Sequence, residues 1–367
     1  MKNQSLFILY KFLIFLLFLI ILKLFSSKLL LLSSNIIVKK LIRRITFMDN
    51  LKETIIKERE SILLVKKEIQ KKIVGQEDMI NKILIGILTG NHILLEGLPG
   101  LAKSLTVNTL AQTLGLKFSR IQFTPDLLPS DIIGTEIYNE KTGEFYIKKG
   151  PLFANIVLAD EINRAPAKVQ SALLEAMQEK QITIAHETFK LESPFIVLAT
   201  QNPIEQDGTY PLPEAQQDRF LMKVKIEYPN RDEEREMLRL LTSPNDFEHI
   251  EINTILNKEK IENLKKIIKH IHIDDKLMDY ILNIIFKTRE SNEYIECGAS
   301  PRASIALVVS AKASAFLEGR EYVTPTDIKK VIFDVLRHRI ILNYEAEADG
   351  KSIEDIIVDI MEQVELP

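Results

Sequence analysis

Tryptophan is absent from this 367-residue chain, and cysteine occurs once, at Cys297. A single cysteine excludes an internal disulfide and fits a reducing compartment. Basic residues are not in excess either, because 48 Lys and Arg stand against 51 Asp and Glu, for a formal charge of −3. A large basic surface for nucleic acid is therefore not expected, although a local basic patch is compatible with this balance.

What is present is typical of a globular protein, apart from the N-terminus. Hydrophobic residues make up 46% of the chain and charged residues 27%. By a prior of roughly 100–200 residues per domain, the length accommodates about two domains. The sequence shows no internal repeat and no long linker.

The first 47 residues differ from the rest, because they contain no Asp, Glu, Ala, Gly or Pro. Within them, Leu6–Phe25 is almost wholly apolar and close to the ~20 residues that span a bilayer as a helix. Four basic residues follow between positions 39 and 44, and they would keep the remainder of the chain in the cytoplasm. The apolar run is too long for a secretory signal and lacks the small-residue cleavage site.

The same composition is typical of translated A/T-rich non-coding DNA, and an ordinary helical protein start follows at Met48. We therefore expect translation to begin at Met48, with a true membrane anchor over residues 1–47 as the alternative. In both cases the rest of the chain is expected in the cytoplasm. The intact mass of the native protein would distinguish the two starts.

Beyond Met48 the chain changes character once. From His92 to about residue 228, short apolar runs alternate with helical patterns, which predicts an α/β sandwich with a parallel sheet. After Pro229-Asn230 the strand signals fade and helical patterns dominate. We therefore predict an α/β domain over residues 48–228 and a smaller all-helical domain over residues 229–367.

A phosphate-binding loop follows the first apolar run, His92–Glu96. The string Gly97-Leu98-Pro99-Gly100-Leu101-Ala102-Lys103-Ser104 precedes a helical pattern, and it matches G-x-x-x-x-G-K-[ST] except that Ala102 replaces a Gly. Small residues let backbone N–H groups turn toward phosphates, and the helix N-terminus adds a favourable dipole. We expect Lys103 to reach the β- and γ-phosphates and Ser104 to ligate Mg²⁺.

A second apolar run, Asn155–Ala159, ends in Asp160 and Glu161. A buried strand that delivers two carboxylates at its carboxyl end matches the Walker B element of nucleotide hydrolases. Asp160 would hold Mg²⁺, directly or through water, and Glu161 would orient and activate the attacking water. Acidic residues in the first turn of a helix are the ordinary alternative, but the phosphate loop upstream favours the Walker B interpretation.

A third apolar run, Phe195–Thr200, leads into Gln201-Asn202-Pro203. An amide at the end of such a strand can hydrogen-bond the attacking water or the γ-phosphate, which makes Asn202 a candidate sensor. A plain turn at Asn202-Pro203 is the alternative.

Two arginines are candidates for stabilising charge on the transferred phosphoryl group. Arg219 lies at the end of the α/β pattern and, in a ring, would enter the site of the neighbouring copy. Arg302 lies at the start of a helical pattern and could contact the γ-phosphate from the helical domain. The alternatives are a surface ion pair of Arg219 with Asp218 or Glu214, and a solvent-exposed Arg302.

Four stretches together resemble the MoxR family of AAA+ ATPases: Glu96–Lys103, Ala159–Pro166, Ala199–Pro203 and Leu212–Phe220. Ile73-Val74-Gly75-Gln76 also matches, and in such proteins this stretch lies near the adenine. The resemblance extends from about Met48 to the C-terminus. It implies that ATP is bound by Val74, Gly75, Gly97, Pro99, Gly100, Leu101, Ala102, Lys103 and Ser104.

The resemblance also implies an architecture and an assembly. We expect a sheet of strand order 5-1-4-3-2 with a helical lid, an insert within Thr124–Gly150 that turns at Thr142-Gly143, and a hairpin within Gln181–Leu191. Members of the family are thought to form hexameric rings that hydrolyse ATP and act as chaperone-like machines on partners with von Willebrand factor A domains. None of that partner chemistry is visible in these residues.

Several other functions compete. A GTPase would need an Asn-Lys-x-Asp motif, and the nearest string, Asn257-Lys258-Glu259-Lys260, ends in Lys. A nucleic-acid motor is disfavoured by the net negative charge and by the lack of an aromatic and basic stripe. A magnesium-chelatase-type motor subunit is close in sequence class and stays an alternative. A nucleotide-gated module without hydrolysis would be expected to lack Glu161 or Arg219.

Three further features carry weaker signals. His270-Ile271-His272 has no indicated third metal ligand and is expected to be a surface strand or loop. Cys297 is expected to pack rather than to act as a nucleophile. Arg164 follows the two carboxylates closely, and the sequence leaves open whether it serves a neighbour's site or an ion pair.

Overall fold

The computed structural model describes residues 51–204, 209–242, 250–290 and 293–367. The segment 1–47, and with it the expectation of a membrane anchor or a later start, lies outside the described residues. The chain divides into two compact units, Met1–Thr54 and Ile55–Pro367, and the described residues of the first unit are helical. Within the described part of the chain, no helix is both long and apolar enough to cross a membrane.

Five strands form the central sheet of the second unit: β1 (Ile93–Glu96), β2 (Phe118–Gln122), β5 (Ile156–Asp160), β8 (Ile196–Gln201) and β9 (Met222–Lys225). Their order is β2-β5-β8-β1-β9, and all neighbours are parallel. Numbered among themselves and read from β9, this is the expected order 5-1-4-3-2. Because the strands are parallel, all their carboxyl ends lie at one edge of the sheet and all their amino ends at the other.

The three apolar runs form strands because a parallel sheet is covered on both faces and needs apolar side chains on both. Each strand lies within one residue of the predicted run, and β5 is buried at every position. One face of the sheet, which includes Leu94, Val157 and Val197, packs against α6 (Ala167–Glu179) in a single buried cluster. Helices α3 (Glu77–Thr89) and α4 (Lys103–Thr113) flank the phosphate-loop strand in the chain.

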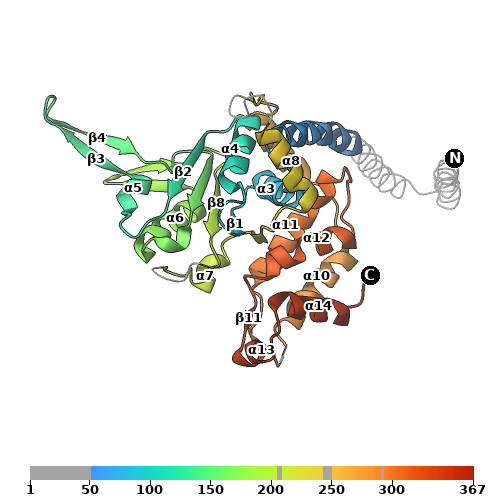
Figure 1. Cartoon of the computed structure of the whole chain (residues 1–367). Helices are drawn as coiled ribbons and strands as arrows, with labels where there is room; N and C mark the ends of the chain where they lie inside the picture. The colour runs from blue at the N-terminus through green and yellow to red at the C-terminus, as the bar shows by residue number, and fades with distance from the viewer. Residues whose placement is uncertain (1–50, 205–208, 243–249, 291–292) are drawn as a thin grey trace, which may run out of the picture. The chain divides into compact units, whose positions relative to one another are not determined.

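Two antiparallel hairpins are added to the sheet-bearing region. The first comprises β3 (Gly134–Asn139) and β4 (Glu144–Lys149), follows the short α5 (Pro129–Ile133), and turns near Gly143. The second comprises β6 (Gln181–Ile184) and β7 (Glu187–Lys190) and precedes β8. Both expected hairpins are therefore confirmed. Figure 1 shows β3 and β4 as a long ribbon that extends away from the sheet.

The rest of the unit is mainly helical: α8 (Arg231–Leu241), α9 (Lys258–Lys269), α10 (Asp275–Lys287), α11 (Pro301–Leu317), α12 (Pro325–Leu336), α13 (Tyr344–Ala348) and α14 (Ile353–Gln363). A small antiparallel pair joins β10 (Ile295–Cys297) to β11 (Ile341–Leu342). This pair was not predicted, because strands of three and two residues leave no periodic pattern. Cys297 ends β10 and is exposed, so the expectation that it packs is wrong.

Candidate functional site

The phosphate loop joins the carboxyl end of β1 to α4, which places it at the carboxyl edge of the sheet. Gly100 has φ 86° and Ala102 has φ 54°, both in the left-handed region. A Cβ at Gly97 would lie 2.9 Å from the Cβ of Ile226, so glycine is needed there for space. Ala102 takes the conformation that glycine would provide, at a backbone cost of about 1–2 kcal/mol.

Lys103 begins α4, and its ammonium is held inside the loop. Nζ donates to the carbonyl oxygen of Gly97 at 2.6 Å and to that of Leu98 at 3.2 Å. Burial lowers the pKa of Lys103, while the charges of Asp160 and Glu161 raise it. The ammonium is therefore held by the loop backbone and feels the charge of both carboxylates. A bound polyphosphate would replace the carbonyl contacts.

A cavity of about 350 Å³ lies beside the loop. It is lined by Pro99, Gly100, Leu101, Ala102, Lys103, Ser104, Arg120, Gln122, Asp160, Glu161, Thr200 and Asn202. The structure thus brings the loop, both Walker B carboxylates and the candidate sensor together in one cavity. They meet because β1, β5 and β8 are adjacent parallel strands whose carboxyl ends share an edge.

Asp160 is buried, and both of its carboxylate oxygens accept hydrogen bonds. Oδ1 accepts from the hydroxyl of Thr200 at 2.6 Å. Oδ2 accepts from Nη2 and Nε of Arg120 at 2.5 and 3.0 Å. Arg120 comes from β2, the strand beside β5, and about half of its side chain is exposed. The carboxylate is thus fixed in orientation by a threonine and by a cation with access to solvent.

Glu161 follows in a left-handed conformation, with φ 57°. Its backbone N–H donates to the hydroxyl of Thr200 at 2.8 Å. Its Oε2 accepts a hydrogen bond from Nε2 of Gln122 at 2.7 Å and lies 3.1 Å from Nε of Arg164. Thr200 therefore links the two acidic residues, and Arg164 forms an ion pair within the chain.

Asn202 is buried after β8, and its Oδ1 accepts a hydrogen bond from the backbone N–H of Ile204 at 3.2 Å. The side chain therefore stabilises a turn and also lines the phosphate-loop cavity. The two interpretations of this residue, as a turn former and as a sensor, are compatible.

The stretch that precedes α3 borders a second cavity. Val74 and Gly75 are half-buried, and a Cβ at Gly75 (φ 68°) would lie 2.7 Å from a side-chain atom of α8. The next residue, Gln76, lines a cavity of about 690 Å³ together with residues of α12 and of the segment after β9. Ile226, which abuts Gly97 of the phosphate loop, also lines this cavity, so the two cavities are neighbours.

The oxygen donors present fit a magnesium ion that is held together with phosphate. Mg²⁺ prefers oxygen ligands and usually keeps several waters, and the Ser104 hydroxyl and the Asp160 carboxylate line one cavity. Elsewhere among the described residues, no group of three His, Cys, Asp or Glu could hold a metal. His270 and His272 are both exposed, as expected of a surface segment.

The two candidate arginines lie at the opposite edge of the sheet. Arg219 stands shortly before β9, and Arg302 is in the first turn of α11. They line a cavity of about 280 Å³ that also includes His92, the residue before β1. At about 3.3 Å per strand residue, the length of β1 places this amino edge roughly 15 Å from the phosphate loop.

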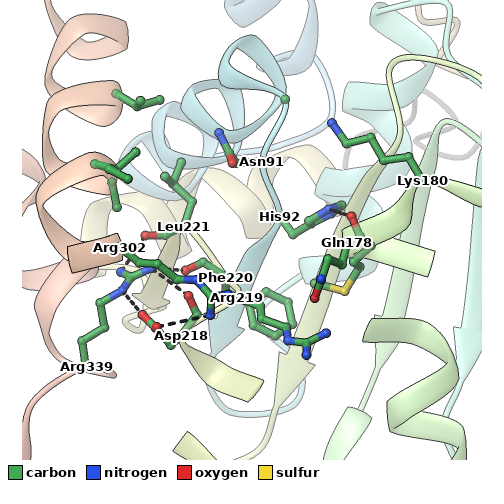
Figure 2. A pocket seen from close by; sticks show the side chains of 15 residues that line it. Asn91, His92, Gln178, Lys180, Asp218, Arg219, Phe220, Leu221, Arg302 and Arg339 are labelled. Atoms are coloured by element: carbon green, nitrogen blue, oxygen red, sulfur yellow. Dashed lines mark hydrogen bonds and ion pairs between the residues drawn. The ribbon is translucent and has the colours of Figure 1, made fainter. Parts of the chain in front are cut away.

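This amino-edge cavity is strongly cationic, because its lining includes Lys180, Arg219, Arg302 and Arg339. Figure 2 shows Asp218 among them. Nη1 of Arg302 lies 3.4 Å from Oδ2 of Asp218, and more than half of the Arg302 side chain is exposed. Arg219 is exposed, and its Nη1 donates to the carbonyl oxygen of Leu174 at 3.3 Å. Both guanidinium groups are therefore available at the surface.

Comparisons with known proteins agree with this geometry. Residues 92–222 match the ATPase family associated with various cellular activities (AAA), and residues 287–360 match the AAA lid domain. Chaperone MoxR1 of Mycobacterium tuberculosis is 47% identical over 82% of this chain and 81% of its own. The chain belongs to the MoxR family of AAA+ ATPases. Membership of this family implies nucleotide binding, typically with Mg²⁺.

Two further relatives extend the MoxR assignment over most of the chain. YeaC, an uncharacterized protein of Bacillus subtilis, is 46% identical over 82% of this chain and 92% of its own. The crystal structure of a candidate ATPase from Cytophaga hutchinsonii is 51% identical, with a TM-score of 0.81, and covers 87% of this chain and 99% of that one. The fold shared with that structure therefore includes both the sheet and the helical lid.

Sequence reasoning missed three residues of the phosphate-loop cavity: Arg120, Gln122 and Thr200. Arg120 and Gln122 alternate along β2, and Gln122 is in register with Asp160. Because side chains two apart on a strand share a face, the two point to the same side. The alternating polar pair in the run Phe118–Gln122 could have suggested that both residues line the cavity. That inference, however, requires knowing that β2 pairs with β5.

Proposed function

We propose that this protein hydrolyses ATP at sites completed between two copies in a ring. One observation carries the proposal: a sheet with a phosphate loop and two carboxylates at its carboxyl edge, and a cluster of arginines at its amino edge. Because the edges are separated by the length of the strands, the arginines of one copy lie far from its own loop. A heterologous, head-to-tail contact repeated around a ring would bring the two halves together.

Within one copy, the roles follow from the contacts at the carboxyl edge. Lys103 and the loop N–H groups would bind the β- and γ-phosphates, and Ser104 and Asp160 would hold Mg²⁺. The ion, when bound, neutralises developing negative charge on the phosphates. Glu161 would orient the attacking water and accept its proton, and Asn202 would hold that water or the γ-phosphate in line. These assignments are supported by the shared cavity of all five residues.

The adjoining cavity of about 690 Å³ would hold the adenosine. Gln76, which directly follows Val74 and Gly75, lines it. Its lining combines residues of the α/β domain proposed for residues 48–228 with residues of the helical domain proposed for residues 229–367. Nucleotide binding there would set the angle between the two domains. The neighbouring copy would supply its Arg219 as an arginine finger, a guanidinium that stabilises charge on the transferred phosphoryl group. In the present conformation Arg302 faces the same way, so it too would act on the neighbour rather than on its own γ-phosphate.

The work done by hydrolysis is proposed to be the remodelling of a protein client by a hexameric ring. The support is family membership together with the name of the Mycobacterium tuberculosis relative, which is described as a chaperone. A partner with a von Willebrand factor A domain is part of this proposal. A pull-down with the Glu161→Gln protein locked on ATP, followed by mass spectrometry, would test it. Recovery of no protein with such a domain would contradict it.

The shared site is tested by measuring Mg²⁺-dependent ATP hydrolysis per protomer across a protein concentration series. A specific rate that climbs steeply with concentration, in step with ring assembly measured by light scattering, is the expected result. A measurable rate that is the same for monomers and rings would contradict a site shared between copies. No rate at any concentration would contradict autonomous hydrolysis.

A further inference from the structure

Asp218 is the centre of a contact cluster between the sheet-bearing region and the lid. Its carboxylate is mostly buried, with 16% of the side chain exposed. Oδ1 accepts from Nε of Arg339 at 2.8 Å. Oδ2 accepts from the hydroxyl of Ser300 at 3.0 Å and from Nη1 of Arg302 at 3.4 Å. One carboxylate thus binds three lid residues, and it immediately precedes Arg219 in the chain.

Arg339 is the buried partner in this cluster, with only 3% of its side chain exposed. Besides the Asp218 carboxylate, its guanidinium donates to four backbone carbonyl oxygens. Two lie on either side of Arg219, at Phe220 (2.5 Å) and Asp218 (3.3 Å). A third belongs to Leu221, at 3.0 Å, and the fourth to Val335 within the lid, at 2.5 Å. The Arg339 guanidinium therefore holds the backbone that carries Arg219 against the end of α12.

The chemistry of arginine explains why this position is charged although it is buried. A buried ion pair stabilises a fold no better than well-packed apolar residues would. The planar guanidinium, however, presents five donors in fixed directions, and here they meet one carboxylate and several carbonyls at once. What the pair supplies is a fixed geometry between the lid and the segment 218–221.

We propose that Asp218 and Arg339 are positioning residues that hold Arg219 and Arg302 as one unit for the neighbour's nucleotide (Figure 2). Arg219 is set through its backbone, which Arg339 clamps, and Arg302 is set through its guanidinium, which Asp218 binds. The contacts of Asp218 and Arg339 therefore fix the position of one arginine relative to the other. The inference rests on the proposed function, in which these arginines act on the adjacent copy.

The test uses Asp218→Asn, which keeps the shape of the side chain and removes its charge. We expect ATP turnover to fall by about 10- to 100-fold, the range for a small misplacement of reacting groups. The affinity of the variant for a non-hydrolysable ATP analogue should stay unchanged, because its own phosphate loop is intact. Asp232→Asn is the matched control, since Asp232 is exposed on α8 with 89% of its side chain accessible.

Mixing distinguishes positioning of the arginines from a general effect on the fold. Lys103→Ala protein lacks a working phosphate loop but keeps intact arginines. In mixed rings the intact pocket of Asp218→Asn faces the intact arginines of Lys103→Ala, and we expect hydrolysis to return. Arg219→Ala mixed with Lys103→Ala runs in parallel as the reference.

Each outcome has a separate meaning. Rescue of both mixtures supports the inference. Rescue of the Arg219→Ala mixture alone overturns the positioning role of Asp218 and leaves the shared site standing. Rescue of neither mixture contradicts the shared site itself. Wild-type or raised turnover of Asp218→Asn alone would also overturn the inference, because Asp218 would then be irrelevant or a brake.

Ser300 provides a second route in case Asp218→Asn does not fold. Ser300→Ala removes the lid hydroxyl that binds Oδ2 of Asp218 and leaves no buried charge unpaired. A several-fold loss of turnover is expected with analogue affinity unchanged, and Ser300→Thr, which keeps the hydroxyl, should restore the rate. Equal turnover in the alanine and threonine variants would show that the Ser300 hydroxyl plays no part in positioning the arginines.

Discussion

The two edges of the central sheet carry different kinds of residues. At the carboxyl edge, glycine-rich backbone, one lysine and two carboxylates surround a polar cavity. At the amino edge, the lining of the cavity includes three arginines, a lysine and Asp218. The first is proposed to bind a polyphosphate and a metal, and the ammonium of its loop lysine donates to the loop carbonyls. The second has cations exposed to solvent but no loop in which to seat a phosphate.

In the proposed function, this difference explains why one copy of the chain holds two halves of an active site that do not meet. A parallel sheet separates the residues before its strands from those after them by a full strand length. The α/β arrangement therefore produces one face that offers a nucleotide and another that offers arginines. Loss of the phosphate-loop lysine at the first edge should abolish nucleotide binding, whereas loss of an arginine at the second edge should leave binding intact and remove turnover.

The largest effect is expected for Lys103→Ala at the carboxyl edge. Loss of charge-assisted hydrogen bonds to phosphate should weaken ATP binding by about 100-fold or more, and turnover should disappear with it. Isothermal titration with an ATP analogue measures the first and phosphate release the second. Lys117→Ala, at an exposed lysine before β2, serves as the control. Wild-type affinity in Lys103→Ala would remove Lys103 from the phosphate site.

Arg219→Ala at the amino edge should show most clearly that loss of turnover can occur without loss of nucleotide binding. Loss of an arginine finger typically lowers turnover by about 1,000-fold or more, while nucleotide affinity of the same chain should be unchanged. Arg235→Ala, an exposed arginine on α8, is the control. If Arg219→Ala lowered affinity and turnover together, the arginine would belong to the nucleotide pocket of its own chain. The proposed division of roles between the two edges would then be wrong.

Glu161→Gln should give a protein that binds Mg²⁺·ATP and does not turn it over. Removing a general base costs about 100-fold or more in rate, and the amide keeps the size of the side chain. Single-turnover kinetics separate binding from chemistry here. Gln122→Ala, which removes the hydrogen bond to Glu161, should have a smaller effect. Wild-type turnover in Glu161→Gln would exclude Glu161 as the base.

The amino edge should also be the more sensitive to acid, which is the smallest predicted effect. His92 and His338 are both buried there, and His338 contacts the carbonyl of Phe220. Burial lowers the pKa of His92 from 6.5 to about 4 and lowers that of His338 well below its usual value. In the folded protein both rings therefore stay neutral, and Nδ1 of His92 accepts a hydrogen bond from Val197 N–H at 2.9 Å.

The sign of the pH dependence follows from these shifts. Above about pH 6.5 both states carry a neutral ring, and the full stability is present. As pH falls toward about 4, the unfolded chain takes up a proton that the folded chain does not, so His92 alone destabilises by up to about 3 kcal/mol. Urea midpoints measured between about pH 7.5 and 5 should fall, and His92→Gln should flatten the slope. An unchanged slope would contradict the assignment, with His186→Gln as the exposed control.

The carboxyl edge could be predicted from the sequence because each of its parts is local. The loop 97–104, the pair Asp160-Glu161 and Asn202 each follow an apolar run directly, and parallel strands bring such ends together. Their shared cavity was therefore implied as soon as the runs were interpreted as strands. The polar partners on β2 were missed because that strand contains only one buried residue, so its pattern is weak.

The amino edge could be predicted only in part. Arg219 and Arg302 were found by their motifs, but Asp218 and Arg339 are 121 positions apart in the chain, and no spacing rule connects them. Arg339 follows a helix and has the pattern of a solvent-exposed terminal arginine. Its burial results from the docking of α12 beside β9, a tertiary contact that neither element shows alone.

The most direct test of the shared site mixes Lys103→Ala with Arg219→Ala, two proteins expected to be inactive alone. In a random equimolar ring about a quarter of the interfaces join an intact pocket to intact arginines. We predict that Mg²⁺-dependent ATP hydrolysis returns on mixing, to a comparable fraction of the wild-type rate. If assembled mixed rings, verified by tagged co-purification, stayed as inactive as the separate variants, the two edges would not form one site.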